Sequence, residues 1–333
     1  MDEAGYLISQ GELVAFPTET VYGLGGDALR PEAAARIYAA KGRPSDNPLI
    51  VHIADVEDLK RLAKTVPQDA YLLAEAFWPG PLTMIVERGE AVPLATTGGL
   101  DTVAIRMPDH PVALELIRRS GCVIAAPSAN TSGRPSPTEG VHVREDMDGR
   151  IAMILDSGPV GIGIESTIID LTEEVPMILR PGFITPKMLS EVLGKEVIID
   201  PGLIAADDTT KPKAPGMKYK HYAPKAEMVI IDGDKDAVIR AINEKTAADH
   251  KQGKKVAVIA TEETKENYQA DVVLSMGSRQ DEDSIAKHMY KILRDCDTLQ
   301  VDAIYSESFQ TPRIGQAIMN RLLKAAGHQV IHL

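Results

Sequence analysis

The chain has 333 residues, of which 44% are hydrophobic and 25% charged, and its net charge at pH 7 is −12. This length exceeds what one hydrophobic core usually sustains, so we expect two domains. The two cysteines, Cys122 and Cys296, are isolated, which excludes a disulfide framework and a cysteine-based zinc site. No apolar run reaches membrane length and no basic signal region is visible, so we expect a cytoplasmic protein.

The negative charge is concentrated in the first part of the chain. Residues 1–200 contain 17 Lys and Arg against 29 Asp and Glu, whereas residues 201–333 contain 19 of each. Neither part is basic, which argues against tight binding to nucleic acid. A polyanionic small molecule would need a local group of cations, and a bound divalent metal would help.

The first 200 residues alternate short apolar runs with amphipathic segments, several of which start with Pro or Asp as helices prefer. Predicted strands cover residues 13–16, 49–53, 82–87, 102–107, 122–126, 166–171 and 177–180. Predicted helices cover residues 31–40, 56–64, 68–77, 111–120 and 186–193. The glycine-rich residues 23–28 have the pattern of a flexible turn. The mixture predicts a curved, mixed α/β sheet and not a regular doubly wound one.

Residues 201–225 are polar and punctuated by Pro and Gly, so we interpret them as an interdomain linker. After them, apolar strands alternate with amphipathic helices, which predicts a smaller, Rossmann-like parallel-sheet domain over 226–333. That domain lacks a glycine-rich first turn, so its fold alone does not imply nucleotide binding. Its predicted strands are 228–232, 255–260, 271–276, 301–307 and 329–333, and its predicted helices are 235–250, 285–299 and 314–326.

Familiar catalytic motifs are absent: the sequence has no P-loop, no H-E-x-x-H and no G-x-S-x-G. The candidate residues lie instead in polar loops beside predicted strands. The first loop, PTETVY, brings two threonines, a glutamate and a tyrosine directly after the strand that ends at Phe16. A plain turn has little need of this set, so a functional role is favoured.

The second loop begins KGRPSDNP and leads into a strand that contains His52. Lys41 and Arg43 can neutralise phosphates, Arg43 with a bidentate fork, and Asn47 offers a donor and an acceptor. A lone histidine in an apolar strand is more often a satisfied core residue, and only its neighbours favour a role for His52. These residues suit an anionic ligand.

The third loop, APSANTSGRPSPT (126–138), is rich in hydroxyls and follows a predicted strand, which suits an anion or ribose site better than a disordered linker. Arg106 and Arg180 each lie in an otherwise apolar strand. Since a buried charge is rarely unpaired, each either bridges to a carboxylate or holds an anionic ligand. Together the loops predict a hydroxyl- and Arg-rich pocket for an anionic ligand such as a nucleotide.

Six segments resemble the signature of one family: FPTETVYGLG, KGRPSDNPLIVHI, APSANTSGRPSPT, ESTIID, LRPG and APGMKYKHYAP. They are similar, in the right order from Val14 to Pro224, to Sua5, the two-domain form of the YrdC-like threonylcarbamoyl-AMP synthases. The C-terminal domain matches that family in position and fold type only. The resemblance implies a YrdC-like catalytic domain over residues 1–200, a linker that acts as a lid over 201–225, and a Sua5-type domain over 226–333.

The resemblance also implies an activity: L-threonine, bicarbonate and ATP condense to threonylcarbamoyl-AMP with release of pyrophosphate, and Mg²⁺ accompanies ATP. This is the first step of tRNA threonylcarbamoyladenosine modification. The implied threonine-binding residues are Thr20, His52, Arg106, Ala126 and Ser166. The implied ATP-binding residues are Arg43, Asn47, Thr102, Ser128, Ser136, Arg180 and Tyr222. Lys41 and Arg43 would act catalytically by stabilising charge on the phosphates, and no metal ligand is assigned.

In the linker, Gly216 would serve as a hinge, Tyr219 and Tyr222 as aromatic cover, and Lys218, Lys220 and His221 as charge. A transferase that modifies tRNA would use the product. The chain could be a monomer or a homodimer, and no membrane partner is expected.

Three alternatives remain. A YrdC-like module could bind double-stranded RNA or assist ribosome maturation without turnover, although the acidic first part argues against it. The acyl partner could differ, as in hydrogenase maturation proteins, but their acylphosphatase and zinc-finger segments are missing. A regulatory nucleotide-binding protein would bind ATP without turnover.

Overall fold

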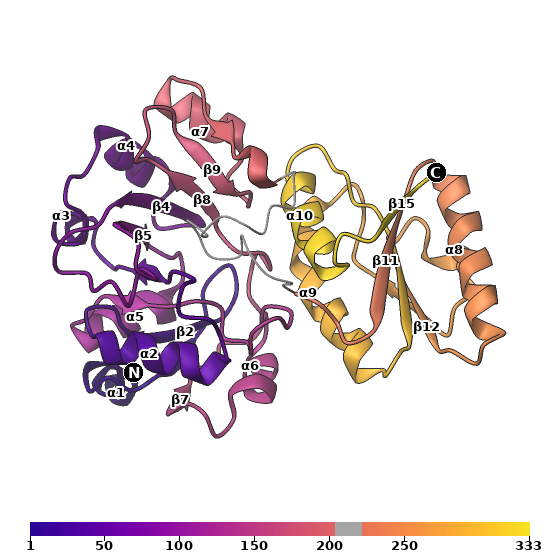
Figure 1. Cartoon of the computed structure of the whole chain (residues 1–333), viewed down its shortest axis with the longest axis horizontal. Coiled ribbons are helices and arrows are strands. Elements are labelled where there is room, and N and C mark those ends of the chain that lie inside the picture. The colour runs from indigo at the N-terminus through magenta and orange to yellow at the C-terminus, as the bar shows by residue number, and fades with distance from the viewer. Residues whose placement is uncertain (204–221) are drawn as a thin grey trace. The chain divides into compact units, whose positions relative to one another are not determined.

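The computed structural model describes residues 1–203 and 222–333 and divides the chain into two compact units (Figure 1). Unit 1 contains residues 1–132, 136–161 and the described residues from 165 to 203. Unit 2 contains residues 133–135, 162–164 and the described residues from 222 onward. Each unit is built around its own sheet.

Unit 1 contains a ten-stranded sheet in the order β10-β9-β8-β4-β5-β3-β6-β2-β1-β7. Parallel and antiparallel pairs mix: β3 and β5 run parallel, whereas β4 and β5 run antiparallel. The strands are β1 (Val14–Phe16), β2 (Gly23–Asp27), β3 (Ile50–His52), β4 (Leu82–Glu87), β5 (Thr102–Arg106), β6 (Ile124–Ala125), β7 (Met153–Ile154), β8 (Thr167–Asp170), β9 (Met177–Arg180) and β10 (Ile198–Ile199). The predicted mixed sheet is therefore confirmed.

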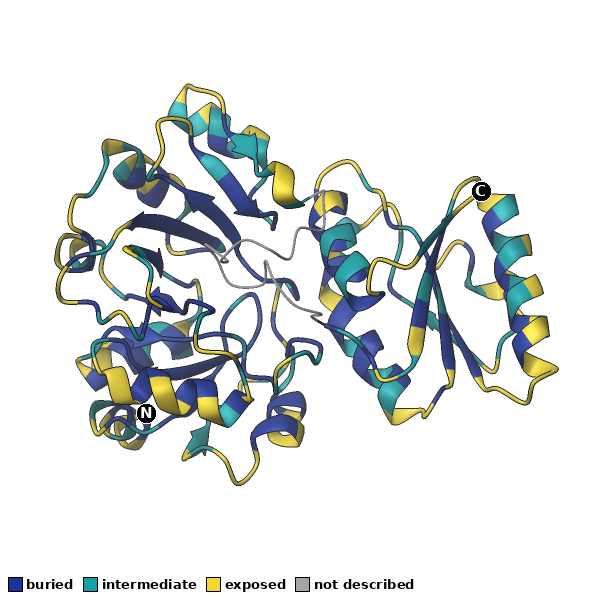
Figure 2. Ribbon diagram, in the orientation of Figure 1, coloured by how far each residue is buried: buried dark blue, intermediate teal, exposed yellow. Residues whose placement is uncertain are grey.

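The central strands of unit 1 are buried on both faces, as the dark strands of Figure 2 show. Val51, Met84 and Ile105 belong to the largest apolar cluster, whereas their neighbours Ile50 and Ile85 belong to a separate cluster. Successive side chains point to opposite faces of a strand, so burial of both faces requires the nearly continuous apolar runs seen in the sequence.

Helices and short 3₁₀ turns connect these strands. They are α1 (Asp2–Ser9), α2 (Pro31–Lys41), η1 (Val56–Asp58), α3 (Leu59–Leu62), α4 (Gln68–Phe77), α5 (Pro111–Ser120), α6 (Gly140–Met147), α7 (Pro186–Leu193) and η2 (Pro201–Leu203). Four predicted helices agree within one residue at each end, because Pro at the first position and Gly after the last mark the limits of α2 and α5. The predicted helix 56–64 is instead split into η1 and α3, and α1 and α6 were not predicted.

The prediction of a flexible turn at residues 23–28 is wrong, since residues 23–27 form the buried strand β2. A Cβ atom built at Gly25 would lie 2.8 Å from both Ile124 and the Phe16 ring. The glycines therefore allow close packing of neighbouring side chains and do not mark a turn.

Unit 2 contains a five-stranded, fully parallel sheet in the order β13-β12-β14-β11-β15. Helix α8 packs on one face and α9 with α10 on the other (Figure 1). The elements are β11 (Glu227–Asp232), α8 (Lys235–His250), β12 (Val256–Ala260), η3 (Lys265–Asn267), β13 (Val272–Ser275), α9 (Glu282–Thr298), β14 (Ala303–Glu307), α10 (Gly315–Ala325) and β15 (Val330–His332). The predicted parallel-sheet, Rossmann-like domain is confirmed.

Among the helices within the described ranges, none is long and apolar enough to cross a membrane.

Candidate functional site

The loop after β1 is shaped by Thr18. Its hydroxyl accepts the backbone N–H groups of Thr20 and Val21, each at 3.2 Å, and donates to the carbonyl of Val21 at 2.6 Å. The hydroxyls of Thr18 and Thr20 lie 2.9 Å apart. Both threonines are buried, so Thr18 forms the turn and thereby fixes the direction of the Thr20 hydroxyl.

Arg106, the last residue of β5, meets this loop. Its guanidinium lies 2.6 Å from the Glu19 carboxylate and donates to the Thr20 hydroxyl at 2.9 Å and to the Gly80 carbonyl at 3.3 Å. Arg106 is 4% exposed. Of the two possibilities that the sequence left open for Arg106, the structure shows the bridge to a carboxylate. Glu19 was noted in the loop but was given no role, because its partner lies 87 residues away.

His52 lies beside Arg106, since these two residues pair across the parallel strands β3 and β5. Burial, together with the nearby Arg106 charge, lowers the pKa of His52 to about 3, so the imidazole is neutral near pH 7. Its Nδ1 lies 3.1 Å from the Ile50 carbonyl. A carbonyl only accepts, so this contact favours a proton on Nδ1, and the ring has a second backbone partner in Ile124.

Lys41, the last residue of α2, is buried, and its ammonium donates to the carbonyls of Ser128 and Asn130. The Lys41 carbonyl in turn accepts the N–H of Ser132 at 2.8 Å. Lys41 therefore fixes the start of the 126–138 loop to the end of α2. This contact explains why a lysine is buried there, since its charge is solvated by backbone dipoles.

Arg43 is half-buried and donates to the carbonyls of Asn47 and Pro48, at 3.4 and 3.1 Å. Asn47 is 1% exposed, and its side-chain oxygen has no hydrogen-bond partner among the described residues. A buried acceptor without a partner is costly. The Asn47 amide is therefore a strong candidate to contact a ligand.

The 126–138 loop runs beside residues 22–24. Backbone bonds join Tyr22 to Pro137 and Leu24 to Pro127, at 2.9 and 2.8 Å. Ser128 donates its hydroxyl to the Asn130 side chain at 2.6 Å. The Ala126 N–H is already bonded to Ile50, so a backbone contact from Ala126 to a ligand would use its carbonyl oxygen.

Ser166 and Arg180 are in direct contact. Arg180 donates through Nε to the Ser166 carbonyl at 2.9 Å and through its terminal nitrogen to the Ser166 hydroxyl at 3.0 Å. Thr83 in β4 lies 2.8 Å from the same hydroxyl. Glu165, next to Ser166, accepts the Ser136 hydroxyl at 2.6 Å. These contacts link the 126–138 loop to the segment that leads into β8.

Residues 80–83, directly before and at the start of β4, contact both the polar group around Arg106 and the polar group around Arg180. The Gly80 carbonyl accepts a hydrogen bond from Arg106, and the Thr83 hydroxyl forms a hydrogen bond with the Ser166 hydroxyl. The structure thus brings together Thr20, His52 and Arg106 on one side of this segment and Ser136, Ser166 and Arg180 on the other. Thr83 and Glu165 were missed by sequence reasoning. The only local sequence signal for either residue was that Thr83 is a lone hydroxyl in an apolar strand.

Thr102 and Tyr222 belong to neither of these polar groups. Thr102 begins β5 and pairs with Glu87, about 13 Å along the strand from Arg106. Tyr222 belongs to unit 2, where its ring packs 5.1 Å from that of Tyr290. The other predicted lid residues, Gly216, Lys218, Tyr219, Lys220 and His221, lie outside the described residues.

Comparison with known proteins connects this arrangement to one family. Residues 6–182 match the Sua5/YciO/YrdC family model, described as "Telomere recombination". Residues 184–327 match the Sua5 C-terminal model, described as "Threonylcarbamoyl-AMP synthase, C-terminal domain". The chain belongs to the Sua5/YrdC family.

Relatives of the family agree over nearly the whole chain. The threonylcarbamoyl-AMP synthase of Pyrococcus abyssi is 51% identical over 98% of this chain and 94% of that protein. The Bacillus subtilis enzyme of the same name is 50% identical over 99% of this chain and 93% of that protein. The crystal structure of P. abyssi Sua5 complexed with L-threonine matches with a TM-score of 0.94 and 49% identity, covering 100% of this chain and 95% of that one.

Proposed function

We propose that this protein is an L-threonylcarbamoyladenylate synthase, which converts L-threonine, bicarbonate and ATP into threonylcarbamoyl-AMP and pyrophosphate. The observation that carries the proposal is the match of both units, over nearly the whole chain, to threonylcarbamoyl-AMP synthases. One related structure contains L-threonine. The buried cluster around Arg106 supplies groups that suit an amino acid.

Threonine would bind at the Arg106 side of the β4 segment. The Arg106 guanidinium suits its carboxylate, and the Thr20 hydroxyl is held in place by Thr18 and Arg106. The neutral His52 imidazole would contact the substrate. Ala126 would contribute its carbonyl oxygen, and Ser166 its hydroxyl. Because Glu19 already pairs with Arg106, the substrate carboxylate would share the guanidinium with it.

ATP would use the residues around the second and third loops and Arg180. Arg43 would contact the phosphates, and the Asn47 amide oxygen would find the partner that it lacks among the described residues. We assign the remaining ATP contacts to Thr102, Ser128, Ser136, Arg180 and Tyr222. Lys41 would act mainly by fixing the Ser128 loop, while its charge favours the phosphates.

The chemistry needs no protein nucleophile. The amine of threonine attacks bicarbonate carbon, and loss of water leaves a carbamate. A carbamate oxygen then attacks the α-phosphorus of ATP, and the bond to the β-phosphate oxygen breaks so that pyrophosphate leaves. Positioning of the reactants can contribute roughly 7–11 kcal/mol, and cationic side chains stabilise the charge that develops on the phosphates.

Magnesium fits this scheme as a companion of ATP. Within the described ranges, no group of three or more His, Cys, Asp or Glu could hold a metal ion. Mg²⁺ usually binds through substrate phosphates with one or two carboxylates and water. When bound, it would neutralise part of the phosphate charge.

We further propose residues 1–200 as the catalytic domain, 201–225 as a linker that closes over the nucleotide, and 226–333 as the Sua5-type C-terminal domain. The product would pass to a transferase that forms threonylcarbamoyladenosine in tRNAs that read ANN codons.

Pyrophosphate release tests the proposal, with threonine and bicarbonate each omitted in turn. We expect release only when both are present with ATP and Mg²⁺, and a much lower rate with serine. ATP binding without any release would contradict the proposal and favour a regulatory nucleotide-binding protein. Salt-sensitive binding of double-stranded RNA without turnover would favour an RNA-binding module.

A further inference from the structure

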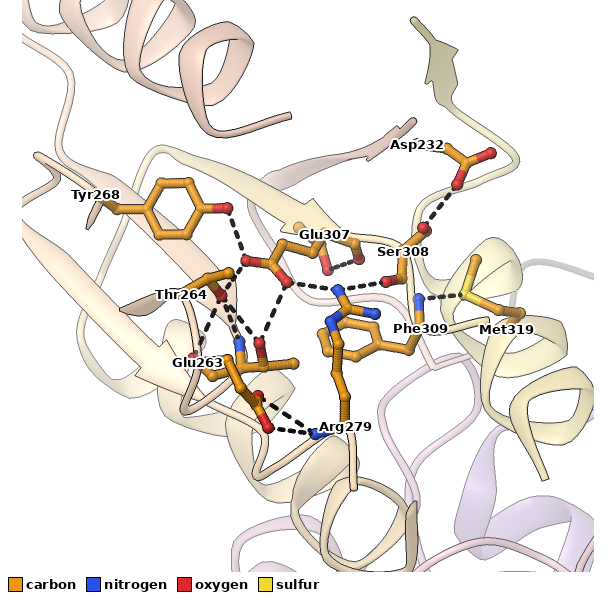
Figure 3. Close-up of polar contacts among 11 residues, drawn as sticks. Asp232, Glu263, Thr264, Tyr268, Arg279, Glu307, Ser308, Phe309 and Met319 are labelled. Carbon is orange, nitrogen blue, oxygen red and sulfur yellow. Dashed lines mark hydrogen bonds and ion pairs between the residues drawn. The ribbon is translucent and has the colours of Figure 1, made fainter. Parts of the chain in front are cut away.

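Unit 2 contains a cavity, lined in part by charged and hydroxyl side chains, that the proposed synthase chemistry does not use. Its volume is about 270 Å³, and its lining includes Gly233, Lys235, Tyr268, Arg279 and Glu307. Gly233 and Lys235 follow β11, Tyr268 follows η3, Arg279 follows β13, and Glu307 ends β14. Figure 3 shows Tyr268, Arg279 and Glu307.

The topology of unit 2 makes this position a natural ligand site. Strands β11 and β14 are neighbours, but the chain leaves β11 for α8 on one face of the sheet and leaves β14 for α10 on the other (Figure 1). The two connections diverge and open a crevice outside the strand ends. In parallel α/β sheets, ligands bind at such points.

Glu307, the last residue of β14, organises the cavity. Its side chain is 3% exposed, and its carboxylate accepts from Tyr268 at 2.7 Å, from Arg279 at 2.6 Å and from Thr264 (Figure 3). Because Glu307 raises the pKa of the Tyr268 phenol, after the larger effect of burial, that group remains a donor. A buried carboxylate needs such donors, and Glu307 thereby fixes the positions of the groups around it.

Arg279 is the group that this network fixes in place. One terminal nitrogen donates to Glu307 and to the Ser308 carbonyl, at 2.6 and 2.9 Å, and the guanidinium lies 5.6 Å from the centre of the Phe309 ring. Its backbone N–H is held by Glu263 at 3.0 Å. The other side-chain N–H groups have no protein partner among the described residues, and the side chain remains 38% exposed. Arg279 is therefore pre-oriented with one edge available.

Lys235 supplies a second cation at the rim. It is the first residue of α8, is exposed, and forms no ion pair within the described parts of the chain. A cation in the first turn opposes the helix dipole, so the helix itself gives no reason for a lysine there. Gly233, whose φ is 152°, allows the chain to turn directly from β11 into α8 beside the cavity.

We propose that this cavity binds the phosphate group of a small molecule between Arg279 and Lys235. The fork of Arg279 and the point charge of Lys235 suit a phosphate. The volume is below the usual range for drug-sized ligands, so it admits pyrophosphate or a phosphate on a small body. The assignment lies wholly within unit 2 and does not depend on the proposed synthase activity.

Hydrogen–deuterium exchange on the full-length protein tests this site separately from unit 1. Inorganic phosphate and pyrophosphate are titrated at constant ionic strength, with acetate and L-threonine as carboxylate probes. We expect both phosphates to slow exchange in residues 233–238 and 277–281, and the carboxylates to leave these segments unchanged. Exchange in residues 41–48 reports on the proposed ATP site in the same experiment.

Three variants make the test specific. Lys235→Ala, which alters an exposed side chain, should raise the half-maximal pyrophosphate concentration about fivefold. Arg279→Lys keeps the charge beside Glu307 but loses the forked guanidinium, so it should raise the half-maximal pyrophosphate concentration about tenfold. Arg240→Ala removes an exposed cation from the same helix outside the cavity lining and should change nothing.

Three outcomes would overturn the proposal: no protection of 233–238 and 277–281 by either phosphate, equal protection by the carboxylates, or an unchanged response in Lys235→Ala. A change confined to residues 41–48 would leave the synthase proposal standing while rejecting this one.

Discussion

The carboxylate of Glu19 lies 2.6 Å from the guanidinium of Arg106, and their side chains are only 12% and 5% exposed. Glu19 lies in the loop after β1 and Arg106 ends β5, so they meet only because β1 and β5 belong to the same sheet. A buried guanidinium needs an anionic partner, and here the protein supplies one beside the proposed threonine site. We therefore expect the pair to link stability to threonine binding.

Replacement of Glu19 by Gln should lower the free energy of unfolding by about 3 kcal/mol, since it leaves a buried arginine without its counter-charge. L-threonine should stabilise this variant more than the wild type, because its carboxylate would restore a partner. Urea denaturation with and without threonine measures both effects. Glu12→Gln, which breaks an exposed ion pair with Arg36, should cost under about 1 kcal/mol. Equal losses in the two variants would refute the special role of Glu19.

Stability should depend on pH through His52. Its pKa is about 3 in the folded protein against about 6.5 in the unfolded chain, so below pH 6.5 only the unfolded chain binds the proton. The contribution of the neutral His52 to the free energy of unfolding is fully present above pH 6.5. It is lost as pH falls toward 3, at about 1.4 kcal/mol per pH unit.

Denaturation curves between pH 5 and 6.5 would measure how the free energy of unfolding changes with pH. His52→Gln should reduce this slope by up to about 1.4 kcal/mol per pH unit, which corresponds to one proton. His332→Gln serves as the control, because that side chain is 75% exposed. A slope that is the same in wild type and His52→Gln would contradict the assignment of a buried, neutral imidazole.

Arg43→Ala should reduce threonine-dependent pyrophosphate release well over tenfold, because an arginine on the phosphates stabilises developing charge. Arg43 is half-buried and donates to backbone carbonyls of its own loop, so the thermal midpoint should change little. Arg150→Ala is the matched control: Arg150 is exposed and also donates to one carbonyl, that of Ala40. Near-wild-type turnover in Arg43→Ala would remove Arg43 from the site.

Gly25→Ala should destabilise unit 1 by about 1–3 kcal/mol, since the new methyl group would lie 2.8 Å from Ile124 and from Phe16. Gly161→Ala is the control, because its Cβ would meet only a carbonyl oxygen at 3.8 Å. Urea denaturation compares the two. A neutral Gly25→Ala would show that β2 packs more loosely than the structure indicates.

Sequence patterns alone predicted those features of the fold and the candidate site that depend on residues close together in the chain. Alternating apolar runs and amphipathic segments gave the two α/β units, and helix-start prolines and helix-end glycines gave the limits of α2 and α5. A polar loop before a strand identified Arg43 and Asn47 as candidates, and a charge within an otherwise apolar strand identified Arg106 and Arg180. The resemblance to Sua5 supplied the family, which the comparisons confirm. These features depend on residues within a few positions of one another.

What the sequence could not determine depends on residues that are distant in the chain and adjacent in the sheet. Residues 23–27 have the pattern of a turn, yet they form the buried strand β2, in which Phe16 and Ile124 approach Gly25 too closely for a side chain. The pairing of Arg106 with Glu19 and the donors around Glu307 likewise come from separate segments. Only tertiary structure decides such contacts, because burial selects the partner of a charged group by its position in space and not by its spacing in the sequence.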